Sequence, residues 1–148
     1  MTKHLEDLPA DLMEIASDCL ERKPRTEAAL RSAVSRSMYA VQSAARIGFG
    51  KDLEKLYSAD KYLVAWCRAR LDSVNDQDPG DVLQTIFRAR ISADYHLHQP
   101  SPADKSERVV YLASQLINAI ADYAEKVASG EITKRIEDGD GTKSWRGA

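Results

Sequence analysis

The stretch Asp81-Val-Leu-Gln-Thr-Ile-Phe-Arg-Ala-Arg-Ile-Ser-Ala-Asp-Tyr-His-Leu97 decides the fold, because its apolar residues recur at helical spacing. On a helical wheel, one face carries the apolar side chains Val82, Leu83, Ile86, Phe87 and Leu97. Arg90 and Asp94 fall within that same face, at the i, i+4 spacing that allows an ion pair. Charges on an inward face are costly unless they are paired, so this pair is predicted either to fix the packing or to belong to a site.

The rest of the chain shows the same helical periodicity, and strand alternation is missing. We expect further helices after Pro9 and over about residues 26–47, 52–71 and 102–129, with the quoted helix ending near Gln99, before Pro100. The segment 76–80, Asp-Gln-Asp-Pro-Gly, predicts a turn and a new helix start. These elements predict an all-α fold: an antiparallel up-and-down four-helix bundle over residues 1–128, with an additional N-terminal helix and a flexible tail over residues 129–148.

The composition favours one domain, because 148 residues with 43% hydrophobic and 30% charged residues can supply both a core and a hydrated surface. A net charge of −2 does not point to a general binder of polyanions. The stretch from Arg22 to Arg46, however, contains six basic residues and a single acidic residue, Glu27. This stretch predicts either a contact with RNA or an acidic partner, or a solvated helix face.

The two cysteines, Cys19 and Cys67, lie on or beside apolar stripes, which favours small buried side chains over a redox pair. No secretory signal is recognisable before Leu5, and no run of about 18 apolar residues occurs. We therefore expect a cytoplasmic protein that has no membrane partner.

Several chemistries lack their sequence motifs. There is no Glu-x-x-His pair for a di-iron bundle, no phosphate-binding glycine loop and no Gly-x-Ser-x-Gly turn. His96 and His98 form a His-x-His step, but no third ligand is evident, so solvated or capping histidines are favoured over a metal site. We expect no metal and no cofactor.

Two motifs resemble the HEPN domain family. The segment Arg31-Ser-Ala-Val-Ser-Arg-Ser-Met-Tyr-Ala-Val-Gln-Ser-Ala-Ala-Arg46 looks like the second helix of these domains, and Arg90-Ile-Ser-Ala-Asp-Tyr95 looks like their Arg-x-x-Ala-Asp-Tyr signature. The resemblance covers about residues 12–127. It implies a four-helix bundle that dimerises, with the polar motif near the dimer cleft. Many members are metal-independent ribonucleases, often toxins paired with a nucleotidyltransferase antitoxin, and others bind RNA or nucleotides without catalysis.

The ribonuclease members carry an Arg, four to six intervening residues and a His, and the spacing of Arg90 and His96 fits this pattern. Ile91 stands where those members commonly have Asn, Asp or His. On a straight helix, Arg90 and His96 are about 120° and about 9 Å apart. Their convergence therefore requires a bent helix end, a long reach of the arginine or a second subunit.

The resemblance implies roles for six residues. Catalysis would use His96 to transfer the proton of a ribose hydroxyl and Arg90 to stabilise the phosphate. In binding, Asp94 would either position or neutralise Arg90, and Tyr95 would stack on a base or pack. Arg36 and Tyr39 lie opposite the core stripe of their helix, where a monomer exposes them to solvent and a dimer would place them in an interface or ligand cleft.

We therefore expect a HEPN-type RNA-directed protein and a homodimer. Its first predicted activity is that of a metal-independent endoribonuclease of a toxin–antitoxin system. The alternative is a non-catalytic module that binds nucleotide, RNA or a partner protein such as a nucleotidyltransferase. A structural role for the Arg90–Asp94 pair, which would then only fix the helix register, is equally compatible with the sequence.

Overall fold

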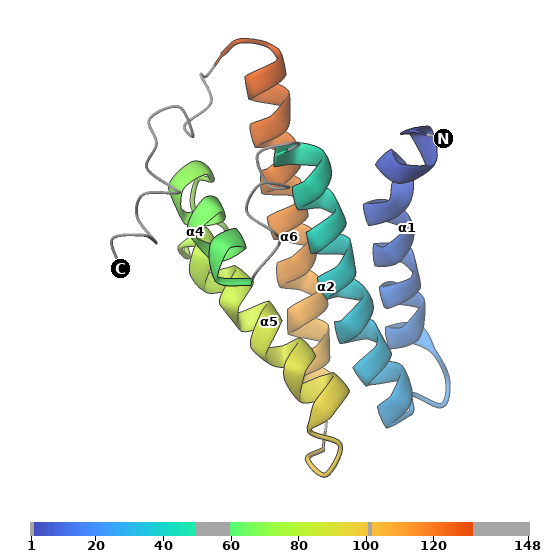
Figure 1. The fold of residues 1–148 in the computed structure, drawn as a ribbon. Helices are drawn as coiled ribbons and strands as arrows, with labels where there is room; N and C mark the ends of the chain where they lie inside the picture. The colour runs from blue at the N-terminus through green and yellow to red at the C-terminus, as the bar shows by residue number, and fades with distance from the viewer. Residues whose placement is uncertain (1, 50–59, 101, 132–148) are drawn as a thin grey trace.

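The computed structural model describes residues 2–49, 60–100 and 102–131, and these residues form five helices and no strand (Figure 1). The helices are α1 (Thr2–Glu21), α2 (Glu27–Phe49), α4 (Asp60–Arg70), α5 (Pro79–Tyr95) and α6 (Ala103–Ala128). The predicted all-α class is confirmed for the described residues. No helix among them is long and apolar enough to cross a membrane.

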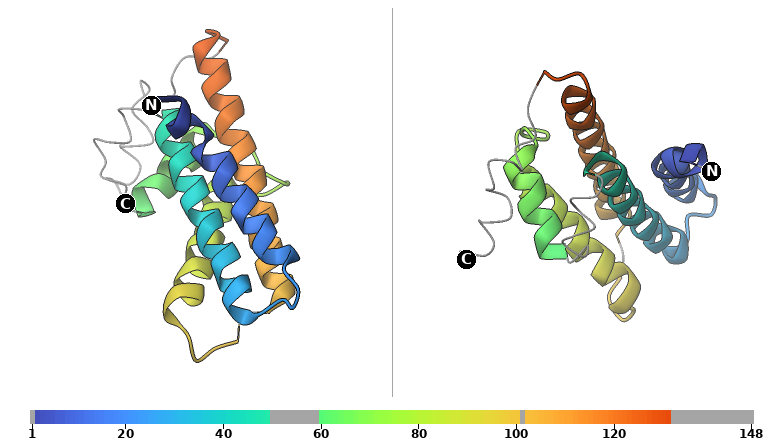
Figure 2. Two further views of the ribbon diagram at one scale, coloured as in Figure 1. Left: turned by 90° about the vertical axis from the view of Figure 1, so that its right-hand side faces the viewer. Right: turned by 45° about the horizontal axis from the view of Figure 1, so that its top comes forward.

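Helix α2 lies at the centre of the bundle, where it packs against α1, α5 and α6. Helix α4 packs on α5, and α1 lies on the far side of α2 from both (Figure 2). In Figure 1, α1 and α5 run downward, whereas α2, α4 and α6 run upward. The direction therefore alternates along the chain for α1, α2, α5 and α6, but α4 runs in the same direction as α2.

The main core is built from α2, α4, α5 and α6, with Leu71 and Val74 from the connection between α4 and α5. Its most deeply buried large apolar side chains are Met38, Val41, Trp66, Val82, Leu83, Ile86, Leu112, Leu116 and Ile120. Helix α1 contributes Ala16 to a second, smaller cluster with Ala33 and Val110. The N-terminal helix is therefore peripheral to the main core.

The two cysteines differ in their environments. Cys67 is fully buried in the main core, and burial raises the pKa of its thiol to about 12, although the positive charge of Arg70 acts in the opposite direction. Cys19 is only half-buried. The expectation of a small buried side chain is confirmed for Cys67 alone.

Two predicted helix boundaries are wrong. Helix α1 begins at Thr2 and contains Pro9 instead of following it. A proline removes one backbone donor and crowds the carbonyl four residues earlier, so Pro9 interrupts the hydrogen bonds of this helix without ending it. Helix α5 ends at Tyr95 instead of near Gln99, so Leu97 lies outside the helix and is 69% exposed.

The predicted turn and helix start at residues 76–80 are confirmed. Asn75 and Asp76 adopt positive φ angles of 53° and 61°, and α5 follows with Asp78 as its N-cap and Pro79 in its first turn. One carboxylate oxygen of Asp78 accepts hydrogen bonds from the backbone N–H groups of Gly80 (2.8 Å) and Asp81 (3.2 Å). Such a cap satisfies donors that a helix start leaves without partners.

Helices α2 and α6 approach one another closely near the end of α2. A Cβ atom on Gly48 would lie only 2.7 Å from Cγ2 of Ile120. Gly48 lies within α2, just beyond the end near residue 47 that the sequence predicted for this helix. At the end of α6, Gly130 adopts a positive φ of 78°, a conformation in which glycine commonly follows a helix. Most of the predicted tail, residues 132–148, and the predicted helical residues 52–59 lie outside the described residues.

Candidate functional site

The Arg90–Asp94 ion pair predicted from the sequence is present on α5. Nε of Arg90 lies 3.1 Å from Oδ2 of Asp94, and the two side chains are 23% and 26% exposed. The pair is therefore half-buried at the surface between α2 and α5, not in the middle of the apolar face as the helical wheel suggested. A helical wheel gives only the direction in which a side chain leaves its helix. Whether that side chain is buried depends on which neighbouring helix covers that side.

Ser35 of α2 holds the carboxylate from the other side. Its hydroxyl lies 3.0 Å from Oδ1 and 3.2 Å from Oδ2 of Asp94, so it can donate to either oxygen. Asp94 is thus fixed between two helices. The ion pair uses only Nε of Arg90, which leaves the two terminal nitrogens of the guanidinium without a carboxylate partner.

Tyr39 of α2 lies next to this guanidinium. The centre of its ring is 5.7 Å from Cζ of Arg90, within the range of a cation–π contact, and its side chain is 39% exposed. Partial burial lowers the pKa of Arg90, but the hydrogen bonds and charges of Tyr39 and Asp94 outweigh this effect and hold the pKa above its ordinary value. Arg90 is therefore a permanent cation beside an accessible aromatic ring.

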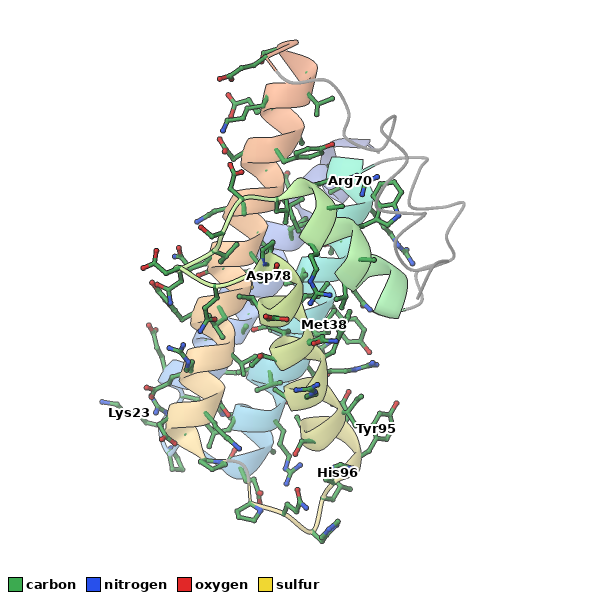
Figure 3. All side chains as sticks on the ribbon, turned by 90° about the vertical axis from the view of Figure 1, so that its left-hand side faces the viewer. Lys23, Met38, Arg70, Asp78, Tyr95 and His96 are labelled. Atoms are coloured by element: carbon green, nitrogen blue, oxygen red, sulfur yellow. The ribbon has the colours of Figure 1, made fainter. Side chains whose placement is uncertain are left out.

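The surface around this group combines charge with apolar side chains. Arg36 is exposed and has no ion-pair partner among the described residues. Ile91 is 41% exposed and Tyr95 is 66% exposed. Figure 3 shows Tyr95 directed away from the bundle near the lower end of α5, so it does not pack in the described fold. We use the name arginine–tyrosine face for Tyr39 and Arg90, which are in contact, together with the exposed Arg36 on α2 and Tyr95 at the end of α5.

His96 lies just beyond the end of α5, at its C-cap (Figure 3). Its backbone N–H donates to the carbonyl of Ser92 (3.1 Å), and its exposed ring lies 6.2 Å from the ring of His98. No hydrogen bond joins His96 to Arg90 or Asp94. Arg90 thus lies within α5 and His96 just beyond its end, without a direct contact between their side chains.

Arg31 of α2 is an important residue that the sequence reasoning missed. Its guanidinium donates to the carbonyls of Ser92 (3.1 Å) and Ala93 (2.9 Å) in the last turn of α5, and to those of His96 and Gln99 beyond it. Glu27 holds the same guanidinium in an ion pair of 3.0 Å.

A helix end leaves carbonyl groups without partners and favours a nearby cation, but α5 has no basic residue in its own last turn. Arg31 supplies that cation from α2 and is only 13% exposed. The sequence does show that Arg31 lies one turn before Ser35, on the same side of the same helix. It could not show that the Arg31 side chain would reach the end of α5.

No group of three or more His, Cys, Asp or Glu side chains in the described part of the chain is placed to hold a metal ion. In comparisons with known proteins, no family model, curated protein or solved structure matches the chain.

Proposed function

We propose that this chain is a HEPN-type RNA-directed protein that binds RNA through its arginine–tyrosine face without cleaving it as a single chain. The observation that carries the proposal is the arrangement of Arg90, which Asp94 holds in place beside the accessible ring of Tyr39. The motif resemblance described above agrees with this arrangement. Among the functions considered, the non-catalytic module is therefore preferred to the ribonuclease.

The chemistry of this face suits single-stranded RNA. Bases stack on exposed aromatic side chains, and arginine binds phosphate through its planar fork of donors. Tyr39 and Tyr95 supply two accessible rings, while Arg36 and Arg90 supply two cations. Because Asp94 occupies only one nitrogen of Arg90, it positions this side chain and still leaves donors for a phosphate.

The different surroundings of Arg90 and His96 favour binding over cleavage by one chain. A general base must lie within hydrogen-bond reach of the proton that it removes, whereas Arg90 is bound to Asp94 within α5 and His96 lies beyond the helix end. In a dimeric ribonuclease, His96 of a second copy would supply the base. The exposed Tyr39, Ile91 and Tyr95 have the composition of an interface core, and this keeps a dimeric ribonuclease as the second candidate.

Fluorescence anisotropy with a labelled single-stranded RNA tests the proposal. We expect saturable binding that weakens with salt, because phosphate contacts release counterions. Tyr39→Ala should weaken binding about tenfold, because stacking contributes about 1–3 kcal/mol per base. Tyr111→Ala is the matched control, since Tyr111 is 47% exposed on α6, away from the arginine–tyrosine face.

Two results would overturn the proposal. The first is the absence of saturable RNA binding by the wild-type chain, and the second is equal affinity of the two tyrosine variants. Incubation of the same RNA in a chelator tests the second candidate. Cleavage that disappears in His96→Ala would replace the binding module with the ribonuclease.

A further inference from the structure

A cavity of about 450 Å³ lies between α5 and α6, on the side of α5 opposite Arg90. Arg88 lines the cavity and is two residues from Arg90, which corresponds to about 200° around the helix. The buried side chains Val34, Val109 and Leu112 form an apolar floor. The exposed side chains of Arg88, Lys105 and Arg108 also line it, so the cavity combines an apolar floor with a cationic rim.

Among the described residues, none of the three cations of this rim forms an ion pair. No acidic residue is among the described residues that line the cavity. Both acidic residues of α5 are engaged elsewhere, Asp81 with Arg68 and Asp94 with Arg90. Glu107, which lies next to Arg108 in the sequence, pairs with Arg25. Asp104 lies next to Lys105 in the first turn of α6, but it forms no ion pair with the rim. The rim therefore combines three cations with one nearby carboxylate and keeps a net positive charge.

The wall of the cavity is held in place before any ligand arrives. Gln99 and Pro100 line it, and the carbonyl of Gln99 accepts a hydrogen bond from Arg31. Pro102 also lines it as the N-cap of α6, where no side chain accepts from the first-turn N–H groups. A helix start favours a negative charge close by, and Asp104 in the first turn of α6 supplies one. The feature that distinguishes this opening is therefore the three cations that two helices bring to it.

We propose that this cavity is a binding site for a small organic phosphate. The phosphate group would lie at the rim, where Arg88, Lys105 and Arg108 can donate to its oxygens. The organic part would lie against Val34, Val109 and Leu112. The volume falls within the range of small-ligand sites, and an apolar lining with a few convergent polar groups is their usual composition.

The site is separate from the arginine–tyrosine face, and it would remain if the RNA-binding proposal failed. It takes a compact ligand with a phosphate at one end, whereas the other face presents exposed rings to an extended strand. This difference allows the two proposals to be tested on the same protein with different probes.

The test uses the full chain, labelled for NMR, and titration calorimetry with 1-naphthyl phosphate. Inorganic phosphate and 1-naphthol are the comparison probes, because each carries one half of the proposed ligand. We expect 1-naphthyl phosphate to bind at least about tenfold more tightly than either, with the largest shifts at residues of α5 and α6 that line the cavity. Absence of saturable binding, or shifts centred on Tyr39 and Tyr95, would overturn the proposal.

Charge variants complete the test. Arg88→Gln combined with Arg108→Gln should weaken 1-naphthyl phosphate binding by about tenfold or more, because charge-assisted hydrogen bonds to phosphate are lost. All substituted side chains are exposed, so the fold is expected to remain intact. Arg22→Gln combined with Arg46→Gln is the matched control, since both side chains are exposed and outside the cavity lining, and it should leave this affinity unchanged. Equal weakening in the control, or no weakening in the double variant, would show that the cavity does not bind the phosphate.

Discussion

The two faces of α5 carry arginines in opposite situations. On one face, Arg90 pairs with Asp94, and Ser35 of α2 holds the carboxylate. On the other face, Arg88 stands at the rim of a cavity with two further cations and no acid among the residues that line it. The same helix therefore carries one charge that the fold has compensated and one that it has left uncompensated.

This difference separates structural roles from binding roles. A half-buried ion pair with a third partner joins two helices, and removal of one partner leaves a polar group without compensation. An exposed cation with no partner contributes little to folding, but it can bind an anion from outside. Substitutions at the Arg90–Asp94 pair should therefore change stability in addition to RNA binding, whereas substitution of Arg88 should change binding of the phosphate with little effect on stability.

The largest effect is expected at Arg31, which holds the end of α5 next to both faces. Arg31→Ala should lower the free energy of unfolding by about 2–3 kcal/mol, because one largely buried guanidinium donates to several carbonyls. Chemical denaturation measures this change. Arg31→Lys keeps the charge but not the fork of donors, and it should lose about half as much. A loss below about 0.5 kcal/mol in the alanine variant, the size of an ordinary surface substitution, would contradict this role of Arg31.

Asp94→Ala should have the next largest effect. It leaves Arg90 and Ser35 without their shared acceptor, and we expect a loss of about 1–2 kcal/mol, less than for a fully buried pair because water reaches both side chains. A double-mutant cycle with Arg90→Ala isolates the ion pair, and its coupling energy should be about 1 kcal/mol. Additive losses in the cycle would mean that the two side chains do not stabilise each other.

Ser35→Ala should cost about 1 kcal/mol, because a neutral donor to a half-buried carboxylate is removed. Ser32→Ala is the control on the same helix, since Ser32 is exposed and has no hydrogen bond through its side chain among the described residues. Thermal unfolding compares the two variants directly. Equal melting temperatures would show that Ser35 does not link α2 to α5.

Arg88→Gln should change stability least, by no more than about 0.5 kcal/mol, because an exposed cation without a partner adds little to folding. A small gain at low salt is expected, since repulsion with Lys105 and Arg108 is relieved. Unfolding measured at low and high salt checks both points. A loss as large as that of Asp94→Ala would remove the distinction between the two faces.

Local signals in the sequence predicted the start of α5 and the presence of its ion pair. Asp78 and Pro79 act within their own turn, and Arg90 and Asp94 are neighbours on one helix, so both features depend only on short-range geometry. The burial of the pair was predicted less well. It depends on Ser35 and Tyr39, which reach α5 only because α2 presents that side to it.

The end of α5 and the cavity required the tertiary structure. Pro100 indicated a stop near Gln99, but Arg31 takes the carbonyls of Ser92 and Ala93 from another helix, and α5 ends at Tyr95. The cavity depends on the separation of α5 and α6 and on the path of the chain between them. Neither the separation of the two helices nor the path of the chain can be predicted from the spacing of residues along one helix.

Gly48 shows how closely α2 and α6 are matched, and this has a consequence for engineering a more stable variant. Replacement of a helical glycine by alanine is a standard stabilising exchange, and it is worth about 1 kcal/mol where space allows. Here the added methyl group would lie 2.7 Å from Cγ2 of Ile120, an atom attached directly at the branch of its side chain. Overpacking of this kind costs about 1–3 kcal/mol. A design rule based on helix propensity alone would therefore choose the wrong residue at this position, unless Ile120 were made smaller in the same step.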